Sequence, residues 1–391
     1  MLRFNSRIVG AASAFFISSF VFLSQIYILP SGNPQFGHWF GLISIGIAFF
    51  WLFPKFPVKN NSSIFLIYFS LYAFVLNAVW VIKLNDLSFL RDNFYILYNF
   101  LIFISLLLLM PKHAFAERGV IIGGVAGILF LLLVWILGYG RYNSGLRYNG
   151  FFNDPNQMAF WVLCVSAICI LLSKSQVTRV VVLFLAVFLV TLTLSRSGLL
   201  GIVPLVLGGL LIVLSSFSLQ KRLVMLAVIP VSVLALAYFG YFEFLIPLID
   251  RFLTTDFATH GDIRGYTRIL NYPEYLMFGA GKGLDWRFGT HYEIHSTWAG
   301  ILFYYGVVGL GLVLFALYKI ASRLTVAEKL LFLAPLAFGF ATYGFRTPIF
   351  WVFLAVFAHV SLSRRRFGPS SLKVEENRGT LVSEPYLGKP V

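Results

Sequence analysis

The sequence predicts an all-α polytopic membrane protein with about twelve transmembrane helices and one long polar loop. Hydrophobic residues make up 59% of the 391 residues and charged residues only 12%, whereas soluble globular domains carry about 25% charged residues. The apolar residues are gathered in runs that approach the ~20 residues needed to cross a bilayer. Because so apolar a chain must place its excess surface in lipid, we predict one membrane bundle rather than a series of soluble domains.

The predicted helices follow one another with short connections, apart from a single polar stretch. We place helices one to nine within residues 1–240, a polar loop at 241–294, helices ten to twelve within 295–363, and a polar tail at 364–391. The tail is mixed in charge and poor in apolar residues, which is typical of a disordered segment. The first run is long enough to span, so we interpret it as a signal anchor. The apolar runs are 8–29, 37–54, 63–82, 94–110, 119–139, 157–173, 178–194, 198–215, 223–239, 295–317, 329–345 and 347–362.

The distribution of Lys and Arg predicts the orientation of the bundle. The net charge is +15, and a charge of this size could indicate a nucleic-acid partner. If the N-terminus is cytoplasmic, 19 of the 30 Lys and Arg residues lie in the inner segments and 11 in the outer ones. This asymmetry follows the positive-inside rule. The basic charge is therefore a topology signal, and we predict cytoplasmic termini, an outer long loop and no bound nucleic acid.

Many of the outer basic residues lie at the ends of predicted helices. They include Lys83 after the third run, Arg141 and Arg147 after the fifth, and Arg346 in the turn between the last two. One interpretation is that each side chain extends to the lipid headgroups. Arg196 fits this interpretation least well, because its turn between the seventh and eighth runs is very short. Arginines on one face could instead hold a diphosphate, since guanidinium offers paired planar donors and keeps its charge.

A polar segment precedes the sixth run. Asp154, the proline after it and Gln157 predict a helix start, with Asp154 as the N-cap and Gln157 closing a capping box. This structural interpretation leaves Arg141, Arg147 and Asn156 unexplained. We therefore treat these three as candidates for binding.

His295 lies where the polar loop meets the tenth apolar run. An imidazole at this boundary can accept a proton near neutral pH, although a histidine that only caps the helix is an alternative. His291 and Glu293 lie close by in the sequence, but no third ligand is evident, so we predict no metal site. The segments after the tenth run offer no outer carboxylate that could orient the imidazole.

Three segments together resemble the motifs of one family. Residues 295–309 read His-Ser-x9-Gly-x2-Gly, which resembles the His-[Asn/Ser/Gln]-x9-Gly-x2-[Gly/Thr/Tyr] motif of bacterial O-antigen ligases and related polysaccharide polymerases. Residues 193–198 resemble the Ser-Arg-x-Gly turn of that superfamily. Residues 147–156 resemble its Arg-x-x-Gly-x-Phe-x-x-Pro-Asn stretch, with approximate spacing before Pro-Asn. The three segments occur in the family's order, and the long loop precedes the histidine as it does there.

The resemblance implies a type-C glycosyltransferase of the bacterial inner membrane with a periplasmic active face. Such an enzyme transfers a glycan from undecaprenyl diphosphate to the hydroxyl of an acceptor sugar and needs no metal or other cofactor. The acceptor is either lipid A core, for a ligase, or a lipid-linked repeat unit, for a polymerase, and the sequence does not decide between them. The resemblance implies that His295 is the base that activates the acceptor hydroxyl and that Arg147 and Arg196 bind the diphosphate. The other residues that we expect to bind substrate are Lys83, Arg141, Asn156, Ser296 and one of Arg264 or Arg268.

Two other function classes fit a bundle of this size. A lipid-linked glycan flippase or another twelve-helix transporter would have ionisable groups near mid-membrane and a repeat of two halves. The predicted helices are nearly free of charge at their centres, and we find no such repeat. A non-catalytic role in an assembly is the third alternative. Flux of substrate across vesicles that lack any acceptor would favour the transporter.

Overall fold

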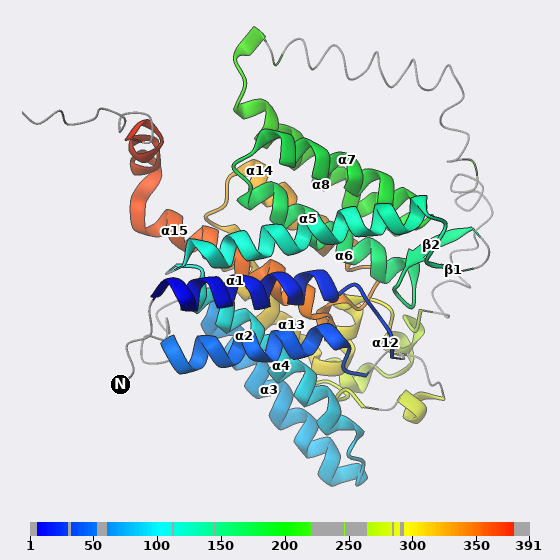
Figure 1. Cartoon of the computed structure of the whole chain (residues 1–391). Coiled ribbons are helices and arrows are strands. Elements are labelled where there is room, and N and C mark those ends of the chain that lie inside the picture. Colours follow the sequence, from blue (N-terminus) through cyan, green and yellow to red (C-terminus); the bar gives the residue numbers. More distant parts are fainter. Residues whose placement is uncertain are drawn as a thin grey trace, which may run out of the picture.

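In the computed structural model we describe residues 6–29, 33–52, 61–111, 113–143, 146–220, 222, 246, 264–283, 285–289 and 293–378. Helices dominate this part of the chain (Figure 1), and its one sheet is a hairpin of two antiparallel strands, β1 (Arg141–Asn143) and β2 (Arg147–Gly150). The helices are α1 (Ser6–Leu23), α2 (Phe36–Leu52), α3 (Asn61–Leu84), α4 (Ser88–Leu109), α5 (Ala114–Ile136), α6 (Pro155–Leu172), α7 (Gln176–Leu192), α8 (Arg196–Ser215), α12 (Thr267–Asn271), α13 (Thr297–Ala321), α14 (Val326–Phe338) and α15 (Pro348–Arg378). Short 3-10 helices are η3 (Pro273–Tyr275), η4 (Asp285–Phe288) and η5 (Gly344–Arg346).

Most of the predicted runs coincide with a helix. The ninth run, 223–239, lies outside the described residues, as does much of the predicted loop at 241–294. Six helices, α3, α4, α5, α6, α8 and α13, contain segments long and apolar enough to cross a membrane, and four others contain shorter apolar segments. The chain is therefore an all-α protein built of apolar helices, as the composition predicts.

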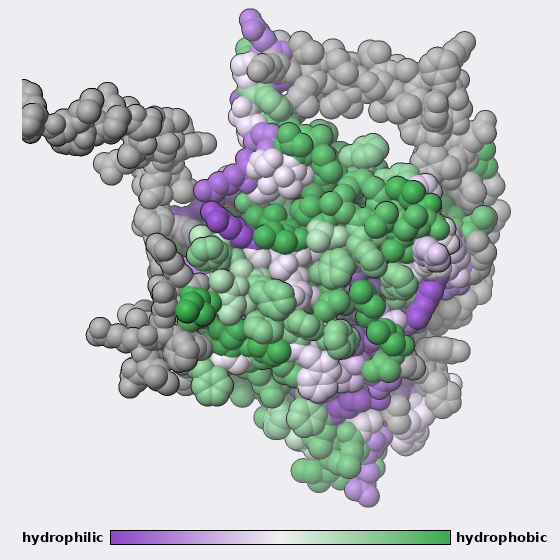
Figure 2. All heavy atoms as spheres, viewed as in Figure 1, coloured by the Kyte–Doolittle hydropathy of each residue, from purple (hydrophilic) through white to green (hydrophobic). Residues whose placement is uncertain are grey.

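The surface of the bundle is apolar where a soluble protein would be polar. Large hydrophobic side chains are widely exposed, among them Phe50 at 92%, Ile82 at 83% and Phe184 at 68%. Figure 2 shows apolar residues spread over the middle of the visible face, with hydrophilic residues gathered toward its edges. Exposed apolar surface on this scale would be unfavourable in water. The helices are therefore suited to a membrane, with lipid as the solvent for these side chains.

Neighbouring helices pack so that their ends meet at two opposite faces. The first helix, α1, lies between α2 and α5, while α13 packs on α3, α14 on α8, and α15 on α4 and α6. The β1–β2 hairpin follows the end of α5 (Figure 1). Because the chain alternates in direction, the starts of α2, α4, α6, α8, α13 and α15 share the face that the Lys and Arg distribution predicts to be the outer one.

The helix ends that differ most from their predictions are those of α14 and α15. The run at 329–345 is a short helix, α14, that ends at Phe338. It stops there because the carbonyls of Gly339 and Thr342 accept hydrogen bonds from Thr297 at the start of α13 instead of continuing the helix. The last helix, α15, continues to Arg378, whereas the sequence predicts a polar tail from 364.

A glycine of the histidine motif produces a break in α13. Gly306 has φ 67° and ψ −176°, a conformation that only glycine adopts readily. The break frees backbone groups that bind the polar loop: Ala280 N–H donates to the Phe303 carbonyl at 2.9 Å, and Val307 N–H donates to the Leu276 carbonyl at 2.7 Å. The motif glycine thus fastens the loop to the helix that begins beside His295.

Replacing Gly306 with alanine is expected to destabilise the protein by about 1–3 kcal/mol, because of its backbone conformation. A Cβ at this position would also lie 2.3 Å from the Met277 carbonyl oxygen. Gly311→Ala, in the same helix, is the matched control, since its Cβ meets no atom within 4 Å. Thermal unfolding of the purified variants measures both, and equal midpoints would contradict the expectation.

Candidate functional site

The start of α13 is anchored by buried hydrogen bonds. Ser296 is the N-cap, and its hydroxyl accepts from Ala299 N–H at 3.3 Å and donates to the Gly339 carbonyl at 3.4 Å. Its side chain is fully buried. Ser296 was predicted to bind substrate, and in the structure these contacts give it the role of capping α13. The backbone next to His295 is therefore fixed in position by these hydrogen bonds.

His295 is placed among four charged residues. Its backbone N–H donates to the Arg264 carbonyl at 3.1 Å, and its side chain is exposed. Although the residue is exposed, the protein packed around part of the ring removes water from it and lowers the pKa of the imidazole below its usual 6.5. Arg346 and Arg264 lower the pKa further, and Glu293 and Asp154 oppose them. Because the pKa lies below 6.5, the ring is mostly neutral at pH 7 and can accept a proton.

Two of the predicted motifs meet directly at Asn156. Arg147, on β2, donates from Nε to the Thr193 carbonyl at 3.1 Å and from Nη2 to Asn156 Oδ1 at 3.4 Å. Ser195 Oγ donates to the same Asn156 oxygen at 2.8 Å. The hairpin, the start of α6 and the turn before α8 are thus joined by side chains that the sequence singled out.

Arg196 begins α8 directly after this cluster. Its neighbour Ser195 caps the helix, and a turn later Gly201 packs so closely on α14 that a Cβ would lie 3.0 Å from the Ala334 carbonyl oxygen. The end of α14 in turn accepts the hydrogen bonds from Ser296 and Thr297. This chain of contacts brings the start of α8 toward the start of α13 and His295.

The start of α6 agrees with the prediction at Asp154 but not at Gln157. Asp154 caps it by accepting from Asn156 N–H at 2.7 Å, so the capping prediction is confirmed. Gln157 does not close a capping box: its Oε1 is buried and has no hydrogen-bond partner. Asp154 bonds the second helical residue rather than the third, so the reciprocal box does not form. Gln157 instead lines a cavity at the face that is predicted to be the outer one.

The two arginines between which the sequence could not choose have different environments. Arg264 is half-buried beside His295 and donates to the Ala341 carbonyl at 3.3 Å. Arg268 is 4% exposed and forms an ion pair of 3.1 Å with the equally buried Asp285. Tyr304 donates to the same carboxylate at 2.8 Å. Arg264 therefore belongs to the His295 cluster, and Arg268 to a buried structural pair.

The remaining predicted residues lie at the margin of this cluster. Arg141, on β1, donates to Asn153 Oδ1 at 2.9 Å, one residue from Asp154. Lys83 lies at the end of α3 with its ammonium 4.7 Å from the centre of the Trp80 ring. Within the described part of the chain, no hydrogen bond or ion pair joins Lys83 to the cluster around His295.

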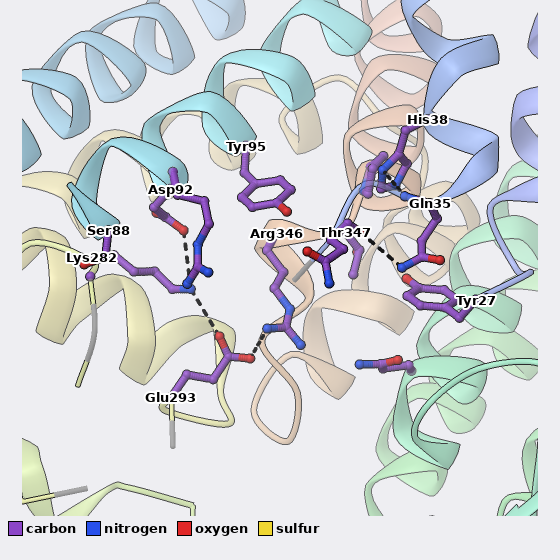
Figure 3. A pocket seen from close by; sticks show the side chains of 15 residues that line it. Tyr27, Gln35, His38, Ser88, Asp92, Tyr95, Lys282, Glu293, Arg346 and Thr347 are labelled. Carbon is purple, nitrogen blue, oxygen red and sulfur yellow. Dashed lines mark hydrogen bonds and ion pairs between the residues drawn. The ribbon is translucent and has the colours of Figure 1, made fainter. Parts of the chain in front are cut away.

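A second group of charges includes Glu293 and Arg346, which also act on His295, and as a group it was not predicted. Lys282 forms ion pairs with Glu293 at 3.1 Å and with Asp92 at 3.4 Å, and Arg346 forms an ion pair with Glu293. Figure 3 shows these four side chains joined in a row. Burial alone would raise the pKa of Glu293, but Arg346 and Lys282 lower it to about 2. Glu293 is therefore ionised at pH 7, and its charge is compensated by the two cations.

This group forms one wall of a cavity of about 210 Å³. Other walls come from the starts of α2, α4, α6 and α15, which contribute Gln35, Arg91, Tyr95, Gln157 and Thr347. Tyr27 and Gln35 lie opposite the charged row in Figure 3. Hydroxyl, amide and carboxylate groups around a small space are suited to a polar ligand such as a sugar.

A sequence signal for this cavity exists but is indirect. Lys282 and Arg346 lie in glycine-containing segments that are predicted to be outer ones, and Glu293 lies two residues before His295. A search limited to residues after the tenth run could not find the carboxylates near the imidazole, because both Glu293 and Asp154 precede it. Only the fold brings Asp92 of α4 to the same row.

No group of three His, Cys, Asp or Glu side chains among the described residues is arranged to hold a metal ion, and His291 lies outside those residues. Neither a family model nor a curated protein matches the sequence.

Proposed function

We propose that the protein is a glycosyltransferase of the O-antigen ligase and polysaccharide polymerase type. It transfers a glycan from undecaprenyl diphosphate to the hydroxyl of an acceptor sugar at the outer face of a bacterial inner membrane. The observation that carries this proposal is the meeting of residues 147–156 with residues 193–195 through Asn156, next to a cluster in which Asp154 and Arg264 act on His295. Distant segments of a chain converge in this way where a shared site depends on all of them.

Each group in the cluster has a chemical task in this reaction. The neutral His295 imidazole takes the proton of the acceptor hydroxyl. The hydroxyl oxygen then bonds to the anomeric carbon as the bond from that carbon to the diphosphate oxygen breaks. The electron pair leaves with the lipid diphosphate, so negative charge grows on its oxygens.

Fixed positive charge stabilises this departure. Arg147, Arg196 and Arg264 supply guanidinium groups on the side of His295 that holds the motif residues, and guanidinium keeps its charge at any relevant pH. Donors already held in place stabilise a growing oxyanion without reorganisation. Arg147 is held in place by the Thr193 carbonyl and by Asn156, so its guanidinium is positioned before a substrate binds. The chemistry needs no metal.

Reconstitution with a defined donor tests the proposal. Purified full-length protein in vesicles receives a polyprenyl-diphosphate-linked glycan and a glycan acceptor, and both the elongated acceptor and the free lipid diphosphate are measured. The expected result is equal formation of the two products. Movement of the donor across the bilayer with no transfer would contradict the proposal and favour a flippase.

The pH profile of transfer is expected to shift in opposite directions in two variants. Transfer falls when His295 becomes protonated, so the acid limb follows the pKa of that imidazole. Glu293 raises this pKa and Arg264 lowers it. Glu293→Gln should therefore move the acid limb to lower pH, and Arg264→Gln should move it to higher pH. Rates measured between about pH 5 and 8 report both; shifts in the same direction would exclude this role for His295.

A further inference from the structure

An apolar groove opens from the polar cavity toward the lipid. The groove has a volume of about 330 Å³ and lies between the first turns of α2 and α4. It shares Asn33, His38, Arg91 and Tyr95 with the polar cavity, so the two form one continuous space. One end of this space is lined by charged and amide groups, and the other by hydrocarbon.

The apolar end faces outward from the bundle. Its walls include Trp39, Leu42 and Phe94, which are 60%, 44% and 71% exposed. Since the surrounding surface is apolar, these side chains meet acyl chains rather than water. A hydrocarbon chain can therefore enter the groove sideways from the membrane without crossing a polar barrier.

The junction of the two parts carries positive charge. Lys282 and Arg346 in the polar cavity are paired with Asp92 and Glu293. Arg91 is exposed, lines both cavities, and forms no ion pair with any described residue. One uncompensated guanidinium at the boundary of an apolar groove and a polar cavity is suited to a phosphate.

We propose that this continuous space binds the acceptor as a polyprenyl-phosphate-linked glycan, which would make the enzyme a polymerase. The chain lies in the groove, the phosphate contacts Arg91, and the sugar occupies the cavity beside Glu293. Its hydroxyl then reaches His295, on which Glu293 and Arg346 of the cavity act, while the donor diphosphate binds at the Arg147–Asn156 cluster. A groove between two helices accommodates one chain, whereas a lipid A anchor has several. This inference rests on the proposed transferase function.

Counting bound lipids tests the second site. Full-length protein in detergent is titrated with undecaprenyl diphosphate, and bound molecules are counted by native mass spectrometry. The wild type should bind two molecules. Leu42→Trp, which fills the groove, and Arg91→Gln, which removes the phosphate contact, should each weaken one of the two by at least about tenfold. Ile43→Trp is the matched control, because Ile43 is also 44% exposed on α2 but does not line the groove.

Three outcomes would overturn the inference. The first is a single bound lipid in the wild type, and the second is equal lipid binding by Leu42→Trp and Ile43→Trp. The third is competition by phosphatidylglycerol that is as effective as that by undecaprenyl diphosphate, because the groove would then be a general phospholipid site. The transferase proposal fails separately, if reconstituted protein forms no product although the two lipids bind. Arg147→Gln, on the donor side, should lose the other lipid and keep the one in the groove.

Discussion

Replacing His295 with alanine is expected to lower the rate of glycan transfer by about 10²- to 10⁴-fold, the contribution typical of a positioned general base. The expectation follows from the position of the imidazole, exposed and mostly neutral at the start of α13, between two groups of charges. The fold should be little affected, because the capping hydrogen bonds come from Ser296 and the His295 backbone N–H remains to bond Arg264. Transfer per folded molecule, measured in vesicles, reports the effect.

A second histidine provides the control. His113 also precedes an apolar helix, α5, and its side chain makes no capping hydrogen bond, but it lies at the opposite face by the predicted topology. His113→Ala should transfer glycan at the wild-type rate. If His295→Ala keeps full activity while remaining folded and inserted, the imidazole is not the base and the proposed mechanism is wrong.

The apolar helices could be predicted from the sequence, because their signal is local. Runs such as 63–82 and 198–215 fall within α3 and α8, since composition alone decides that such a run is helical in lipid. The helix ends were less predictable. The end of α14 at Phe338 depends on hydrogen bonds from Thr297, a residue in another helix, and no local pattern contains that information.

Of the residues in the candidate site, only those that belong to the sequence motifs could be predicted. Arg147 and Asn156 were singled out because a helix cap does not explain them, and the 193–198 turn because it is short and resembles a family motif. The structure joins Arg147, Asn156 and residues 193–195. The Asp92–Lys282–Glu293–Arg346 row escaped prediction because its members come from four separate segments. In the sequence, each basic residue alone could be interpreted as a side chain that extends to the lipid headgroups. Only the ion pairs seen in the structure show that these charges form one network.

Replacing the two loop arginines is expected to have different effects: loss of Arg268 lowers stability, and loss of Arg264 lowers the rate of transfer. Arg268→Ala leaves Asp285 as a carboxylate without its cation at a side-chain exposure of 4%, and breaking such a pair costs about 3–5 kcal/mol of stability. Arg264→Gln removes a cation from the His295 cluster, so it should remain folded and transfer about 10²- to 10³-fold more slowly, as when one donor to an oxyanion is lost.

A double variant separates the structural role of Arg268 from a catalytic one. Adding Asp285→Asn to Arg268→Ala removes the unpaired charge, so much of the lost stability should return, because deleting both partners of a buried pair costs far less than deleting one. The rate of transfer per folded molecule should then recover together with the stability. The two readouts are thermal unfolding in detergent and product formation in vesicles. A double variant that is stable yet inactive, together with an active Arg264→Gln variant, would reverse the assignment, because the cation needed at the departing diphosphate would then be Arg268.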